Sequence, residues 1–251
     1  AAVELMDRAA LASVESKPGM PDGLSTLGPQ AAALLVETRA EDDAGVGRNI
    51  EAILATLAAL PTATPIRFTR DSVEIARLWK VRKGTFPSVG AVRATGTTVI
   101  IEDVAFPVER LADATLDLQA LLHEHGYREA IIFGHALEGN LHFVFTQDFG
   151  SPAEVERYGR FMDAVAQLVV HRYDGALKAE HGTGRNMAPY VELEWGADGL
   201  GLMREIKQLL DPQGLLNPGV ILSDDPQAHL RHLKPLPAAH AIVDKCIECG
   251  F

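Results

Sequence analysis

Residues 130–145 read AIIFGHALEGNLHFVF, two apolar runs separated by the pair Glu138-Gly139. Apolar runs on either side of a short glycine-containing turn predict a β-hairpin. His135 and His142 are equally far from the centre of that turn, so a hairpin centred there places them directly opposite each other. The β-carbons of opposed residues lie about 4.5–5.5 Å apart. The stretch therefore predicts two imidazoles close enough to bind one divalent cation.

Residues 179–185, AEHGTGR, form a second glycine-containing segment that carries candidate ligands. Two imidazoles are too few for a tight metal site, and Glu180 is the expected third ligand. Neighbours in an extended segment point in opposite directions, so His181 can face a different group from Glu180. Two neutral imidazoles and one carboxylate leave coordination positions open, which is typical of a catalytic metal site.

The composition is that of an ordinary globular protein, because 47% of the 251 residues are hydrophobic and 23% are charged. A net charge of −11 argues against a nucleic-acid partner, and less strongly against an anionic membrane surface. No apolar run is long enough to span a bilayer, and charged residues over positions 1–20 argue against a signal peptide. Cys246 and Cys249 are the two cysteines, which excludes a disulfide-built secreted fold. We therefore expect a cytoplasmic protein.

Hydrophobic periodicity and turn residues predict alternating strands and helices. The expected strands are residues 31–37, 65–69, 97–104 and the two arms of a hairpin over 130–147. The expected helices are residues 2–15, 49–60, 72–80, 108–125, 152–173, 188–195 and 198–210. This order predicts an α+β fold, with ferredoxin-like strand-helix-strand units on an antiparallel sheet, helices packed on one face, and further C-terminal helices.

We divide the chain into three parts. Residues 1–28 are expected to be an N-terminal helix and linker, and residues 29–222 the substrate and metal domain. Residues 223–251 are expected to be a linker, because residues 223–245 are rich in Pro, His and Asp, and this part ends in half of a cysteine motif, Cys246-Ile247-Glu248-Cys249-Gly250-Phe251. We therefore expect the chain to be a piece of a longer protein.

Four motifs resemble those of one family, in the family's order. They are Trp79-Lys80-Val81-Arg82-Lys83, the histidine hairpin over 134–142, Glu180-His181-Gly182-Thr183-Gly184, and DPQGLLNPG at 211–219. Together they resemble the C-terminal substrate domain, or cap domain, of FAD-linked oxidases of the vanillyl-alcohol-oxidase type. Within that family the chain is most similar to D-lactate and D-2-hydroxyglutarate dehydrogenases. Its Cys-x-x-Cys-Gly-Phe ending resembles the start of an iron–sulfur module that is fused to this domain in a subgroup.

The resemblance implies roles for the residues of the site. His135, His142 and Glu180 would hold a divalent cation, commonly zinc, that polarises the substrate oxygens. His181 would be the general base that takes the hydroxyl proton as hydride leaves for the flavin, a role that suits histidine because an ordinary imidazole titrates near working pH. Glu180 and His181 would thus also lie beside the flavin.

Two further residues receive roles from the same resemblance. Arg82 would bind the substrate carboxylate, since a guanidinium grips a carboxylate with two parallel hydrogen bonds. Asn217 would lie close to the FAD. The FAD itself would be held mainly by a separate N-terminal domain of the same polypeptide, so we expect this chain alone to be inactive.

The implied electron path continues beyond the flavin. Cys246 and Cys249 supply two of the four thiolates that a 4Fe-4S cluster needs, so that cluster is expected in the full-length protein only. Electrons would pass from it to a quinone or cytochrome acceptor, and a peripheral position at the inner face of the membrane is compatible with such an acceptor.

The chain departs from the hydroxyglutarate enzymes at three positions. Where those enzymes have polar side chains that help to hold a dicarboxylate, this chain has Phe86, Ile101 and Val144. The expected substrate is therefore a small D-2-hydroxy acid such as D-lactate, and the expected oxidoreductase is a flavoprotein of the D-lactate dehydrogenase kind.

Two other functions remain open at this point. A stand-alone zinc hydrolase could use Glu138 or His181 to activate a metal-bound water. A ferredoxin-like binding or assembly module would need no catalytic residue at all. Hydrolysis by the isolated chain would favour the first, and unchanged oxidation by a full-length His181→Ala protein would favour the second.

Overall fold

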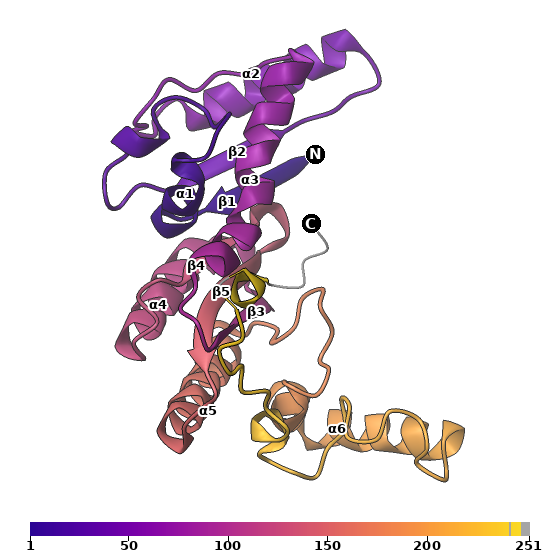
Figure 1. Cartoon of the computed structure of the whole chain (residues 1–251). Coiled ribbons are helices and arrows are strands. Elements are labelled where there is room, and N and C mark those ends of the chain that lie inside the picture. The colour runs from indigo at the N-terminus through magenta and orange to yellow at the C-terminus, as the bar shows by residue number, and fades with distance from the viewer. Residues whose placement is uncertain (241, 247–251) are drawn as a thin grey trace.

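A computed structural model describes residues 1–240 and 242–246 of the chain. Its centre is a five-stranded sheet in the order β2-β1-β4-β5-β3, and every neighbouring pair is antiparallel (Figure 1). The strands are β1 (Ala2–Met6), β2 (Ala33–Glu37), β3 (Thr97–Ala105), β4 (Ile131–His135) and β5 (Asn140–Asp148). The predicted α+β class with an antiparallel sheet is confirmed.

Six α-helices accompany the sheet within the described residues. They are α1 (Arg8–Glu15), α2 (Asp43–Leu57), α3 (Ser72–Val92), α4 (Leu111–Glu124), α5 (Pro152–Gln167) and α6 (Val191–Leu210). An aspartate caps the start of α1, α2 and α3, because Asp7, Asp42 and Asp71 each accept a hydrogen bond from a backbone N–H of the first turn. A single π-helical segment, Leu168–Arg172, extends α5.

Helices pack on both faces of the sheet, not on one face as we expected. Successive strand residues point to opposite faces, and β4 is apolar on both of them. Ile132 belongs to the core cluster that includes residues of α4 and α5, whereas Ile131 and Phe133 belong to the cluster that includes residues of α1 and α3. The continuous apolar run at 130–133 is thus the run of a central strand, which is buried from both sides.

The prediction for residues 2–15 is wrong in its first half. Residues 2–6 form β1, which lies between β2 and β4, and only the following residues form a helix. Pairing on both edges of β1 outweighs the local helical pattern, as tertiary context often does. The strand expected at 65–69 is also absent from the described structure, where this segment has no regular structure and is mostly exposed. The division of the chain at residue 29 stays a prediction.

The register of the β4–β5 hairpin differs from the predicted one. His142 is paired with Phe133, and His135 is paired with Glu4 on β1. The turn contains a 3₁₀ segment, Ala136–Glu138, followed by Gly139 at a φ of 69°. A β-carbon on Gly139 would lie 2.1 Å from the backbone oxygen of Phe106, so only glycine fits this close approach. The longer turn removes the direct opposition of the two histidines.

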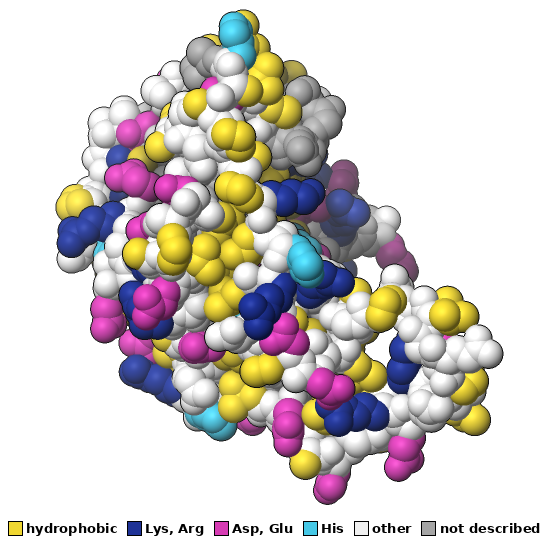
Figure 2. Space-filling view, turned by 60° about the horizontal axis from the view of Figure 1, so that its bottom comes forward, with side chains coloured by type: hydrophobic (Ala, Val, Ile, Leu, Met, Phe, Trp, Pro, Cys, Tyr) yellow, Lys and Arg dark blue, Asp and Glu magenta, His cyan; other side chains and the backbone are white. Residues whose placement is uncertain are grey.

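Helix α6 projects from the rest of the molecule (Figure 1). It consists of two helical parts separated by a non-helical Gly196, which agrees with the two helices expected at 188–195 and 198–210, except that Ala188–Tyr190 forms a 3₁₀ segment. Hydrophobic side chains are visible on this projecting arm in Figure 2, and Leu209, Leu210 and Leu215 are each more than two-thirds exposed. No helix among the described residues has the length and hydropathy needed to cross a membrane.

Candidate metal and substrate site

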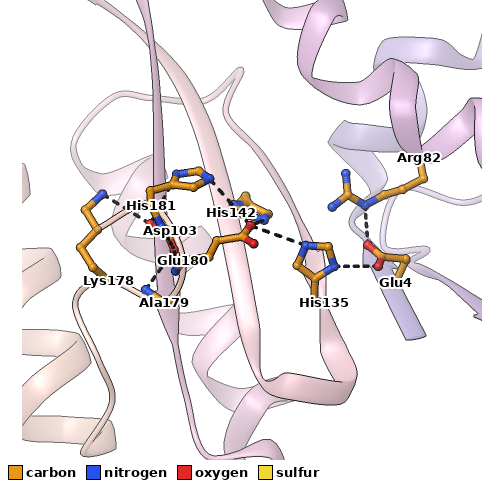
Figure 3. Close-up of polar contacts among 9 residues, drawn as sticks. All are labelled: Glu4, Arg82, Asp103, His135, His142, Lys178, Ala179, Glu180 and His181. Atoms are coloured by element: carbon orange, nitrogen blue, oxygen red, sulfur yellow. Dashed lines mark hydrogen bonds and ion pairs between the residues drawn. The ribbon is translucent and has the colours of Figure 1, made fainter. Parts of the chain in front are cut away.

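Three side chains from two segments place ligand atoms around one point. His135 ends β4, His142 lies within β5, and Glu180 lies in the loop that follows the π-helical segment. Their ligand atoms all lie within 4.8 Å of one another. Glu180 Oε1 is 2.9 Å from His142 Nε2 and 3.6 Å from His135 Nε2 (Figure 3). The predicted trio therefore comes together, although the two histidines are not opposed across a turn.

His142 is held as a neutral imidazole. Its residue surface is only 4% exposed, and this burial lowers the pKa of His142 to about 4, against an opposing contribution from Glu180. Its Nδ1 is buried and has no hydrogen-bond partner among the described residues. Since the neutral ring is the form that binds metals, His142 is ready to act as a ligand near neutral pH.

Asp103 organises the loop that carries Glu180. Its side chain is fully buried on β3, where it is paired with His142. One oxygen, Oδ2, accepts hydrogen bonds from the backbone N–H groups of three successive residues, Ala179 (3.0 Å), Glu180 (2.6 Å) and His181 (3.3 Å). Burial raises the pKa of Asp103, but these hydrogen bonds and the nearby cation of Lys178 outweigh it and lower the pKa overall.

Asp103 was not predicted as a site residue from the sequence. The available signal was a pair of acidic residues, Glu102-Asp103, inside an otherwise apolar strand, where an unpartnered charge would be costly. Glu102 points to the other face, where it is buried against Lys178 and Asn186. The burial of Glu102 raises its pKa, and Lys178 opposes that effect.

His181 lies beside the trio. Its ring stacks on that of His142, with centroids 5.0 Å apart and planes inclined by 25°. Nδ1 of His181 is 3.4 Å from Asp103 Oδ1, and Nε2 is 3.7 Å from Glu180 Oε1. The side chain is 37% exposed. A histidine with one nitrogen near a buried carboxylate and the other at the site has the arrangement of a general base.

Arg82 reaches the opposite side of the site from α3. Its Nε donates to Glu4 Oε2 at 2.6 Å, and its guanidinium carbon lies 4.4 Å from the centroid of the Phe133 ring. The other oxygen of Glu4 is 2.7 Å from His135 Nδ1. Arg82 and His135 are therefore joined through one carboxylate (Figure 3). Glu4 was missed because its segment was predicted to be helical.

The remaining predicted residues lie in different surroundings. Val144 is fully buried, and Ile101 and Phe86 pack against the same apolar cluster as Phe133. Ile101 is paired with Val144, two positions along the strands from the Asp103–His142 pair, so both lie on the face of the sheet that carries His142.

Three other predicted residues are not part of the trio of His135, His142 and Glu180. Asn217 is exposed, with a φ of 43°, in the loop after α6. Glu138, the base of the hydrolase hypothesis, is exposed in the hairpin turn. Cys246 is exposed and free, and Cys249 lies outside the described residues.

The donor set suits a divalent cation. Two imidazole nitrogens and one carboxylate oxygen are a ligand set known from catalytic zinc sites, which keep a further position open for substrate or water. Manganese and iron also accept such ligands. The residues present therefore fit the metal that the sequence resemblance implies.

Comparisons with known proteins give a consistent result. Glycolate oxidase subunit GlcD of Bacillus subtilis is 26% identical over 90% of this chain and 46% of the relative. D-2-hydroxyglutarate dehydrogenase of Xanthomonas citri is 32% identical over 66% of this chain and 36% of the relative. Mitochondrial D-lactate dehydrogenase [cytochrome] of Arabidopsis thaliana is 30% identical over 68% of this chain and 30% of the relative. The chain thus spans less than half the length of each of these relatives.

The fold is also similar to that of a solved structure, 4-ethylphenol oxidase from Gulosibacter chungangensis. The TM-score is 0.51 at 16% identity, over 89% of this chain and 48% of that one, which supports the fold alone. The family model described as "FAD linked oxidases, C-terminal domain" matches residues 1–221. This chain belongs to the family of C-terminal domains of FAD-linked oxidases.

Proposed function

We propose that this chain is the substrate- and metal-binding domain of a flavoprotein that oxidises a small D-2-hydroxy acid to the 2-oxo acid. The observation that carries the proposal is the convergence of His135, His142 and Glu180 within 4.8 Å, beside His181. The names of the three relatives support the substrate class, because glycolate, D-2-hydroxyglutarate and D-lactate are all 2-hydroxy acids.

His135, His142 and Glu180 would hold the divalent cation, most simply zinc. Such a cation acts as a Lewis acid that polarises the hydroxyl and carboxylate oxygens of a bound 2-hydroxy acid. The neutral state of His142 favours metal binding, since a protonated imidazole has no free lone pair. Asp103 keeps Glu180 at the site by holding the backbone of its loop.

Arg82 would bind the substrate carboxylate and His181 would take the hydroxyl proton. Glu4 fixes one side of the Arg82 guanidinium, and Figure 3 shows its two terminal nitrogens turned away from Glu4, an orientation in which they would pair with a substrate carboxylate. His181 can accept a proton while the nearby carboxylate of Asp103 stabilises the resulting imidazolium. The FAD of the complete protein supplies the acceptor for the hydride that leaves the α-carbon.

The surroundings of the site favour a substrate without a second carboxylate. Val144, Ile101 and Phe86 are apolar and lie on the side of the sheet that carries His142. None of them can pair with a distal carboxylate, and an unpaired buried charge is costly. D-Lactate therefore fits better than D-2-hydroxyglutarate.

The complete protein would contain the parts that this chain lacks. We place the FAD mainly in an N-terminal domain of the same polypeptide, with His181 and Asn217 on the side of the site that meets the flavin. Cys246 and Cys249 would begin an iron–sulfur module that carries electrons to a quinone or cytochrome. The word "cytochrome" in the name of the Arabidopsis relative supports such an acceptor.

The test is an oxidation assay of the full-length protein. D- and L-2-hydroxy acids are offered with an artificial dye as electron acceptor, before and after removal of the metal by a chelator. We expect D-lactate to reduce the dye, chelation to stop the reaction, and His181→Ala to lower kcat by roughly 100-fold or more. His171→Ala is the matched control, because His171 is exposed on the π-helical segment. Turnover that survives both chelation and His181→Ala would refute the proposal.

A further inference from the structure

Glu4 is a buried carboxylate with two partners that belong to different parts of the site. It is 4% exposed and lies on β1, directly paired with His135 on β4. Its Oε1 is 2.7 Å from His135 Nδ1, and its Oε2 is 2.6 Å from Arg82 Nε. One side chain thus touches both a candidate metal ligand and the candidate anchor for the substrate carboxylate.

We propose that Glu4 is a positioning residue that sets the tautomer of His135 and, with its other oxygen, the orientation of Arg82. The inference rests on the function proposed above and deepens it. It predicts that the cation and the substrate carboxylate are held in one fixed arrangement, because their two anchors share a single rigid support.

The tautomer follows from hydrogen-bond chemistry. A carboxylate paired with an arginine only accepts hydrogen bonds, so His135 must carry its hydrogen on Nδ1. The lone pair then lies on Nε2, the nitrogen that faces Glu180 Oε1. Metal-binding histidines commonly donate their second nitrogen in this way, which orients the ring and raises its basicity.

His135 and His142 differ in what orients their rings. His142 Nδ1 is buried without a hydrogen-bond partner in the described part of the chain, and packing against Phe133 and His181 orients its ring instead. His135 is more exposed, with a side-chain exposure of 36%, and it ends its strand. Burial cannot orient this ring, so its orientation depends on Glu4.

An amide at position 4 cannot replace both contacts. The carboxylate has two oxygens, one for Arg82 Nε and one for His135 Nδ1. Glutamine has nearly the same shape but only one oxygen, and its NH₂ group can only donate. Glutamine has two ways to bind here. Either its NH₂ group faces the Nε donor of Arg82, and that hydrogen bond is lost, or its NH₂ group donates to His135 Nδ1. In the second case the hydrogen of His135 must move to Nε2, where the metal should bind.

The experiment compares the zinc affinity of the wild-type chain with that of the Glu4→Gln variant, by competition with a chromophoric chelator at neutral pH. We expect Glu4→Gln to bind zinc roughly 10–100-fold more weakly. The ring nitrogens of His135 are followed in the same proteins by ¹⁵N NMR without metal. We expect an Nδ1–H tautomer in the wild type and a mixture, or the Nε2–H form, in Glu4→Gln.

Asp7→Asn is the matched control. Asp7 is a buried carboxylate three residues further along, and it accepts hydrogen bonds from Ala10 N and Gln119 Nε2 without touching the site. This variant should lose stability, yet keep the zinc affinity and the His135 tautomer of the wild type.

Two results would overturn the role of Glu4. One is wild-type zinc affinity in a folded Glu4→Gln protein. The other is an Nε2–H tautomer of His135 in the metal-free wild type, a measurement that needs no variant. His142→Ala separates this inference from the proposed function. If His142→Ala binds zinc as well as the wild type, the metal site itself is wrong, whatever Glu4 does.

Discussion

The two halves of the candidate site are built in different ways. The β4–β5 hairpin supplies His135 and His142 from strands that are paired on both sides, and His142 is almost completely buried. The loop after the π-helical segment supplies Glu180 and His181, whose side chains are 49% and 37% exposed. Strand pairing and core packing therefore fix the hairpin half, whereas hydrogen bonds hold the loop half, among them the three that the buried carboxylate of Asp103 accepts.

This difference has a functional meaning. Under the proposed function the site admits a substrate and meets a flavin, and such a site benefits from one rigid wall and one wall that can adjust. The hairpin gives the rigid wall, and Asp103 on the neighbouring strand β3 holds the backbone of residues 179–181 beside it. Variants that act on the hairpin should therefore affect folding, and variants that act on the loop should affect metal binding more than folding.

The largest expected effect is that of Gly139→Ala in the hairpin turn. An alanine there meets the Phe106 oxygen at 2.1 Å and must adopt a φ of 69°. Left-handed strain of roughly 1–2 kcal/mol and overpacking of roughly 1–3 kcal/mol predict a loss of about 2–5 kcal/mol in the free energy of unfolding. Urea denaturation measures it.

Gly201→Ala is the control for this variant. Gly201 lies in α6, and nothing lies within 4 Å of an added β-carbon. Alanine in a helix should raise stability by about 0.5–1 kcal/mol. A loss for Gly139→Ala no larger than the change for Gly201→Ala would contradict a rigid hairpin.

Asp103→Ala tests the carboxylate that holds the backbone of residues 179–181. The three backbone N–H groups of 179–181 lose their acceptor, and hydrogen bonds to a charged group are worth about 1.5–3 kcal/mol. We expect a stability loss in that range and a fall in zinc affinity of roughly 10–100-fold, the range typical of supporting groups. Chelator competition and urea denaturation on one sample measure both.

Asp211→Ala is a matched control for Asp103→Ala. Asp211 is also buried and accepts backbone hydrogen bonds, from Leu215 and Leu216, but it lies at the end of α6. Its removal should leave zinc affinity unchanged. If both variants weaken zinc binding equally, Asp103 has no special role in the loop.

The pH dependence of the metal-free chain tests the hairpin half. Burial lowers the pKa of His142 from 6.5 to about 4, so the unfolded chain binds its proton at a higher pH than the folded chain does. Stability should therefore rise with pH between about 4 and 6.5, by up to about 1.4 kcal/mol per pH unit from this group. The comparison is urea denaturation of wild type and His142→Gln at pH 5 and 6.5. An equal pH dependence in the two proteins would show that His142 is not held neutral by burial.

The smallest expected effect is that of Gly182→Ala in the loop. Gly182 has a φ of 75°, but nothing lies within 4 Å of an added β-carbon. Only the left-handed strain remains, about 1–2 kcal/mol at most. The free energy of unfolding should fall clearly less than in Gly139→Ala, and a loss as large would mean that the loop is as constrained as the turn.

The sequence predicted the parts of the fold that depend on local pattern. The β-branched run at 97–104 is β3, and the apolar runs on either side of the hairpin turn are β4 and β5. The prediction for residues 2–6 was wrong, because this strand forms by pairing with β2 and β4, which lie far away in the sequence. The predicted register of the hairpin was also wrong, because a 3₁₀ turn replaces the tight one.

The candidate site likewise contains residues that local motifs predict and residues that depend on distant parts of the chain. The trio of His135, His142 and Glu180 could be predicted from motifs, but direct opposition of the two histidines was the wrong reason for their closeness. Glu4 and Asp103 could not be predicted, since each acts through partners that the fold brings from other segments. Supporting residues have no spacing pattern of their own, which hides them in a single sequence.

The most direct test of the cation site is X-ray absorption spectroscopy of the zinc-loaded chain. We predict a shell of nitrogen and oxygen ligands at about 2.0–2.1 Å, with the outer scattering of two imidazole rings, and loss of one ring in His142→Ala. A sulfur shell at about 2.3 Å, or a spectrum unchanged by His142→Ala, would contradict a cation held by His135, His142 and Glu180.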